Sequence, residues 1–135
     1  MDFFKESERL LKEYPTLKLA KQNLEERERE MSRTALQVGG APHYGKQKIK
    51  NEFELEWANI KRQLAYTEAT IHSIERCLSQ LDNEECRIIR LWYIDRVPKE
   101  SILHDMYIES LSSLYALKGR AIESFTLRYF GATAL

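Results

Sequence analysis

The sequence predicts an all-α protein in which a long helical hairpin or coiled coil precedes a small helix-turn-helix bundle. Three observations predict this class. Apolar residues recur at spacings of three and four through most of the chain, which is the period of an α-helix. Charged residues make up 31% of the chain, and glycine and proline are few. Capping residues and a proline divide the last third into short helical segments.

The first helical region covers residues 2–37. Pro15 lacks a backbone N–H and cannot lie inside a helix without a kink, so we expect a break near Tyr14 and Pro15. Three glycines and a proline in residues 38–45 predict a loop that ends this region. The apolar stripe is imperfect, because Ser7, Lys21 and Glu28 occupy positions within it.

Residues 47–81 carry the strongest periodic signal in the chain. A coiled-coil seam of about four heptads is predicted. Its positions are Ile49, Phe53, Trp57, Ile60, Leu64, Thr67, Ile71, Ile74, Leu78 and Leu81. A helix of this length would span roughly 50 Å and cannot bury the stripe against itself. Its partner is either the first helical region, folded back as an antiparallel hairpin, or the same helix of a second subunit, which would make a homodimer.

Residues 82–131 predict three short helices. Asp82 is a candidate N-cap of the first helix, with Glu85 placed as in a capping box. Pro98 opens the second helix, and Ser110 is a candidate N-cap of the third. A tightly joined helix pair whose second helix presents hydroxyl and basic side chains is how many proteins place a helix in the DNA major groove. The predicted domains are therefore residues 1–81, the hairpin or coiled coil, and residues 82–135, the DNA-binding domain.

The same segment resembles a known family. The run ECRIIRLWYIDRVPKESILHDMY, followed by SSLYALKGRAIESF, resembles the region-four helix-turn-helix of sigma factors. It is more similar to phage-encoded late transcriptional activators of the ArpU and RinA type. The matching residues are Glu85, Ile88, Ile89, Tyr93, Ser112, Tyr115, Lys118, Ala121, Ile122 and Phe125. The resemblance covers about the last third of the chain. The turn is one residue longer than the family pattern and lacks its glycine.

The resemblance implies a sequence-specific regulator of phage or prophage transcription that binds double-stranded DNA, as a dimer or as a partner of RNA polymerase. The side chains expected at DNA carry a hydroxyl or a positive charge near the last helix. They are Lys99, Ser110, Ser112, Ser113, Tyr115, Lys118 and Arg120. Lys99, at the start of the preceding helix, is expected to contact a phosphate, and Lys118 and Arg120 are expected to face outward.

Other classes of function lack a matching pattern. The sequence contains no phosphate-binding glycine loop, nucleophile elbow or metal-ligand spacing, so we expect no enzyme activity, no cofactor and no metal. Cys77 and Cys86 lack the CxxC spacing of a zinc site. The N-terminal residues resemble neither a signal peptide nor a membrane span, which predicts a cytoplasmic protein.

Two alternatives remain open. One is a DNA-packaging protein of the small-terminase kind, which also joins a helix-turn-helix to oligomerising helices. The other is a coiled-coil interaction module that binds RNA polymerase or a phage protein without touching DNA. Residues 82–135 hold seven Lys and Arg against eight Asp and Glu, and this near-neutral charge favours the second alternative, because DNA binders usually carry a basic face.

Overall fold

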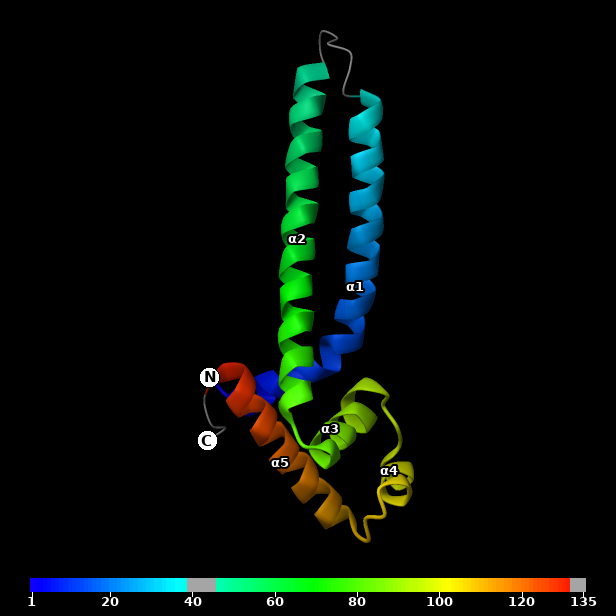
Figure 1. Ribbon diagram of the computed structural model, residues 1–135, viewed down its shortest axis with the longest axis vertical. Helices are drawn as coiled ribbons and strands as arrows, with labels where there is room; N and C mark the ends of the chain where they lie inside the picture. Colours follow the sequence, from blue (N-terminus) through cyan, green and yellow to red (C-terminus); the bar gives the residue numbers. More distant parts are fainter. Residues whose placement is uncertain (39–45, 132–135) are drawn as a thin grey trace. The chain divides into compact units, whose positions relative to one another are not determined.

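The computed structural model describes residues 1–38 and 46–131, and all regular structure in these residues is helical (Figure 1). The elements are α1 (Phe3–Val38), α2 (Lys46–Gln80), α3 (Asn83–Ile89), η1 (Arg90–Ile94), α4 (Lys99–Asp105) and α5 (Leu111–Phe130). The short π-helical segment η1 continues α3 directly. The predicted all-α class is confirmed. The predicted glycine loop lies, apart from Val38 at the end of α1, outside the described residues.

The helix α1 is continuous through Pro15, so the expected break near Tyr14 and Pro15 is wrong. Proline removes one intrahelical hydrogen bond, to the carbonyl of Leu11. Leu11 and Tyr14 are nevertheless buried, and Leu17 is half-buried. We infer that packing of the turns on both sides of Pro15 offsets the missing hydrogen bond and keeps the backbone helical.

The chain forms two compact units, and both long helices contribute to each. The terminal unit consists of Met1–Pro15 and Ile71–Leu135, and the hairpin unit consists of Thr16–Thr70. This division differs from the expected boundary between residues 81 and 82. The reason is that the first turns of α1 and the last turns of α2 bury apolar side chains in the same unit as α3, α4 and α5.

The hairpin unit pairs α1 with α2 side by side within one chain (Figure 1). Leu24 and Ile60 are buried, and most of the predicted seam of α2 is buried or half-buried. Trp57 Nε1 donates a hydrogen bond to Glu28 Oε1 at 3.3 Å, which connects the two helices at the edge of the seam. The stripe of α2 is therefore covered by α1 of the same chain, and the seam needs no second subunit.

The terminal unit has a core drawn from every helix. Its largest fully buried side chains include Leu11, Ile74, Leu78, Ile88, Ile89, Tyr93, Ile102, Leu114, Ile122 and Phe125. One buried polar contact ties α1 to α5, where Ser7 Oγ and Thr126 Oγ1 lie 2.7 Å apart. Thr126 also donates to the carbonyl of Ile122 at 2.7 Å, so Ser7 is the donor to Thr126. The start of the chain is thus part of the helix-turn-helix core.

Two predicted caps begin the helices of this unit. Asp82 Oδ1 accepts a hydrogen bond from Glu85 N at 2.8 Å at the start of α3. Ser110 Oγ accepts from Ser113 N at 3.2 Å at the start of α5. The carboxylate of Glu85 accepts a hydrogen bond from Ser124 Oγ at 2.6 Å and so fastens α3 to α5.

Candidate nucleic-acid interface

The helices α4 and α5 and the turn between them form the predicted helix-turn-helix. The turn runs from Met106 to Ser110, and Tyr107 within it has a φ of 55°. This is the left-handed conformation that glycine adopts most readily. Tyr107 therefore occupies a turn position that favours the glycine of the family pattern. Ile108 N donates to the carbonyl of Leu103 at 2.9 Å and closes the turn.

Three of the predicted DNA-contacting residues meet at the N-terminus of α5. Ser110 Oγ lies 2.9 Å from Ser113 Oγ and 3.3 Å from Ser112 Oγ, and all three residues are exposed. The first backbone N–H groups of a helix lack intrahelical partners and carry partial positive charge. Hydroxyl groups beside them can donate hydrogen bonds to phosphate oxygens or base edges. This end of α5 can therefore bind an anionic group.

Lys99 and Tyr115 form a second group next to the serines. Lys99 Nζ donates a hydrogen bond to Tyr115 Oη at 2.5 Å and lies 5.6 Å from the centre of the Trp92 ring. Tyr115 and Trp92 pack edge to face with ring centres 5.5 Å apart. The side chain of Lys99 is thus held between two aromatic rings, at the start of α4, where its ammonium group remains exposed.

Lys118 points in a different direction from the one expected. Its Nζ lies 3.8 Å from Glu8 Oε2 and 4.7 Å from the centre of the Trp92 ring, and its side chain is only 17% exposed. Glu8 also accepts a hydrogen bond from Tyr93 Oη at 2.6 Å. Burial and the neighbouring Glu8 carboxylate raise the pKa of Tyr93. Lys118 is therefore a partner of Glu8 rather than an outward-facing phosphate contact.

Arg120 lies on another side of α5. Successive residues of an α-helix turn by about 100°, so Arg120 is rotated by about 200° from Lys118. Its charge contributes to the lowered pKa of Asp82, whose main cause is the hydrogen bond from the backbone of Glu85. Arg120 is exposed and near the start of α3. The predicted basic pair on one face of α5 is thus divided between two faces.

The structure therefore brings together Ser110, Ser112, Ser113, Tyr115 and Lys99 and separates Lys118 and Arg120 from them. Sequence reasoning missed Glu8, because it lies 85 residues before its partner Tyr93. It also passed over Trp92 as a site residue. The mixture of aromatic and basic residues around Trp92 was a signal that could have identified it.

Other chemistries have no support among the described residues. No group of three His, Cys, Asp or Glu side chains there could hold a metal ion. Cys77 is buried, and burial raises the pKa of its thiol, so it stays protonated and unreactive at neutral pH. Among the same residues, no helix has the length and apolar character that crossing a bilayer requires. No protein-family model, curated protein or solved structure matches this chain.

Proposed function

We propose that this chain is a transcriptional regulator that binds specific duplex DNA sequences through α4 and α5. The observation that carries the proposal is the exposed N-terminus of α5, where three serine hydroxyls lie beside an α4 that begins with Lys99. In a helix-turn-helix protein this end of the second helix enters the major groove, and the start of the first helix lies along the phosphates. The proposal assigns Ser112, Ser113 and Tyr115 to base edges and Lys99 to a phosphate.

The resemblance to phage late activators of the ArpU and RinA type agrees with this assignment. Its motif residues fall into two groups. Ile88, Ile89, Ala121, Ile122 and Phe125 lie in or beside the core of the terminal unit, where they set the packing of α3 against α5. Ser112 and Tyr115 lie on the exposed part of α5. Regulation of phage or prophage genes, in contact with RNA polymerase, is accordingly part of the proposal.

Selection from a randomised duplex pool tests DNA reading for any target site. We expect a defined sequence motif to be enriched and to bind about a thousandfold more tightly than a scrambled duplex. The binding constant should fall steeply as salt is raised, because phosphate contacts release counterions. A pool that shows neither enrichment nor salt-dependent binding would exclude the proposal.

A charge-adding variant tests which face reads the DNA. Ser112→Glu places a carboxylate at a helix N-terminus, where the helix dipole tolerates it, so the fold is retained. Repulsion from the phosphates should nevertheless abolish binding to the enriched duplex. Gln22→Glu adds the same charge on an exposed position of the hairpin unit and serves as the control. Equal loss of binding in both variants, or loss in neither, would show that the N-terminus of α5 is not the reading face.

One observation favours a second candidate, a protein-binding unit that does not touch DNA. The terminal unit carries 11 Lys and Arg against 13 Asp and Glu, a net charge of −2. The outermost side chains along α5 include Ala116, Glu123 and Leu127, which offer no positive charge. Complete absence of salt-dependent DNA binding in the selection experiment is the result that this second candidate expects.

A further inference from the structure

Two adjoining hollows lie beside the helix-turn-helix and share Trp92 and Arg96. The first has a volume of about 350 Å³ and is also lined by Val97, Pro98, Lys99 and Glu100. The second has a volume of about 330 Å³ and is also lined by Lys12 and Tyr93. We call the two together the Trp92 groove. It joins the start of α1 to the start of α4, and all its residues belong to the terminal unit.

The groove concentrates positive charge in a unit whose net charge is negative. Lys12, Arg96 and Lys99 contribute three exposed cations, and Glu100 is the one carboxylate among the lining residues. Within the part of the chain that the structure describes, Lys12 and Arg96 form no ion pair. Lys99 is bonded to a neutral phenol rather than to a carboxylate.

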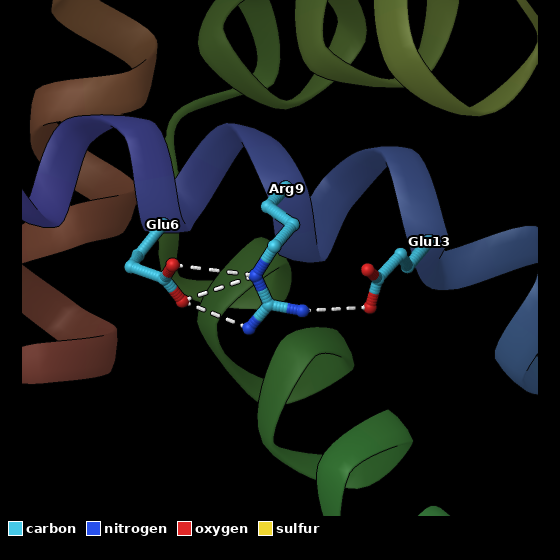
Figure 2. A network of polar contacts seen from close by, with 3 residues as sticks. All are labelled: Glu6, Arg9 and Glu13. Carbon is cyan, nitrogen blue, oxygen red and sulfur yellow. Dashed lines mark hydrogen bonds and ion pairs between the residues drawn. The ribbon is translucent and has the colours of Figure 1, made fainter.

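Arg9 shows by contrast what a compensated cation looks like on the same helix. Its guanidinium lies between two carboxylates, with Nη2 at 2.8 Å from Glu6 and Nη1 at 2.9 Å from Glu13 (Figure 2). Hydrogen bonds from Arg9 lower the pKa of Glu6. The positive charge of Arg9 is therefore satisfied within α1, whereas that of Lys12, one turn further along, is available to a ligand.

The indole of Trp92 is covered by cations rather than left bare. Lys99 and Lys118 place their ammonium nitrogens 5.6 Å and 4.7 Å from the ring centre. A group that enters the groove therefore meets ammonium groups before it meets aromatic surface. An apolar side chain of a partner protein would have to displace them, whereas a phosphate would be attracted to them. The chemistry of the groove favours a phosphate group over an acidic peptide with an apolar anchor.

The backbone at Arg96 holds that cation in place. Arg96 has a φ of 52°, which costs about 1 kcal/mol or more for a residue other than glycine. Hydrogen bonds from Asp95 N to Arg90 O and from Val97 N to Leu91 O, each 2.8 Å long, fix the residues on both sides. Conformations of this kind are retained mainly where the surrounding structure or a function requires them.

We propose that the Trp92 groove binds phosphodiester groups of the DNA backbone, with Lys12 and Arg96 as the contacting cations. The inference rests on the proposed function and extends it, because Lys99 belongs to both the groove and the proposed reading head. The backbone of the bound duplex runs from Lys99 past Arg96 to Lys12. The N-terminal helix is then a part of the DNA-binding surface and not only a support for it.

The salt dependence of DNA binding tests the groove in the full chain. The double variant Lys12→Gln with Arg96→Asn removes both charges, and asparagine tolerates the left-handed backbone at position 96. The slope of the logarithm of the binding constant against the logarithm of salt concentration should become shallower by about 2, since each phosphate contact contributes about 0.9. The enriched sequence motif should stay the same, because neither residue contacts a base.

A matched control separates local contacts from net charge. Arg62→Gln with Arg76→Gln removes two exposed positive charges that do not line the groove, and it should leave the slope within experimental error of the original. A Trp57→Phe background leaves Trp92 as the remaining tryptophan, so its emission should change on titration with a duplex of unrelated sequence. The change should be weakened in the groove variant.

The outcomes separate the two proposals. An unchanged slope in the groove variant, with the wild-type chain still selecting its motif, overturns the groove and leaves the helix-turn-helix reading intact; the groove would then belong to an acidic partner protein. A wild-type chain that binds no duplex at all overturns the proposed function, and the groove proposal with it. Equal loss of slope in the groove variant and the control also overturns the groove.

Discussion

Two residues flanking α4 adopt a backbone conformation that suits glycine better than the side chains present. Arg96 precedes the helix with a φ of 52°, and Tyr107 follows it with a φ of 55°. The side chain of Tyr107 is 92% exposed and gains little from packing. At the residue scale, the helix-turn-helix is therefore built with local strain on both sides of its first helix.

Replacing Tyr107 by glycine should relieve part of this strain. We expect Tyr107→Gly to raise the free energy of unfolding by about 0.5 to 1 kcal/mol, the steric gain less the entropy cost of a glycine. Urea denaturation followed by Trp92 fluorescence measures the change. Tyr107→Ala removes the same ring without relieving the backbone and should bring no such gain. Equal effects from alanine and glycine would contradict this explanation.

The glycines of α5 predict effects of opposite sign. A Cβ at Gly119, inside the helix, would have no atom within 4 Å of it, so Gly119→Ala should stabilise the protein by about 1 kcal/mol. Gly131 ends α5 with a φ of 69°, so Gly131→Ala should destabilise it by about 1 kcal/mol. Thermal unfolding of the two variants measures both effects. A loss of stability in Gly119→Ala would mean that the helix meets a neighbour at this position.

At the element scale, the first turns of α1 belong to the helix-turn-helix core. Leu11 is fully buried, Ser7 bonds to Thr126, and Phe3 and Phe130 have ring centres 5.2 Å apart. These contacts connect the two ends of the chain. The helix-turn-helix is thus a bundle completed by a helix that begins at residue 3, and its last helix depends on that addition.

Truncating one of these side chains should destabilise the whole terminal unit. We expect Leu11→Ala to lower the free energy of unfolding by about 3 kcal/mol, because it leaves a cavity in the core. Leu36→Ala removes the same atoms from an 84% exposed position on the same helix and should change stability by less than about 0.5 kcal/mol. Denaturation followed by Trp92 emission reports on the terminal unit. Similar losses in both variants would show that the start of α1 is not part of this core.

At the scale of the whole molecule, two buried phenols join α1 to later parts of the terminal unit. Tyr14 Oη donates to Glu75 Oε2 at 2.6 Å, and Tyr93 Oη donates to Glu8 Oε2 at the same distance. Burial, followed by the hydrogen bond to Glu75, raises the pKa of Tyr14 to about 12, and burial and Glu8 raise that of Tyr93. The folded state therefore requires both phenols to stay protonated.

The stability of the protein should consequently fall at high pH. In the unfolded chain these phenols ionise near pH 10, whereas in the folded chain they resist ionisation. Their contribution is fully present below pH 10 and is lost as the pH rises from about 10 towards 12. Urea midpoints at pH 8, 10 and 11 measure the decline. In the double variant Tyr14→Phe with Tyr93→Phe the decline should be shallower, and an identical decline would contradict the assignment.

Much of the fold was predictable because its determinants are local. The seam of α2, the Asp82 and Ser110 caps and the apolar stripe of α5 depend on spacings of a few residues. The break predicted at Pro15 was wrong because the missing hydrogen bond is offset by distant packing that local rules do not include. The direction of Lys118 was also misjudged, since its partner Glu8 lies in another helix.

By itself, the sequence determined the all-α class, the positions of the helices and the helix-turn-helix with its serine-rich N-terminus. Helical period, capping and turn preferences act over a few residues and can be read without a structure. Only the tertiary structure decided that α1 completes the bundle, that Lys118 pairs with Glu8, and that Lys12 and Arg96 meet at Trp92. These contacts join residues that are far apart in the chain, and they arise only when buried surfaces of separate helices pack together.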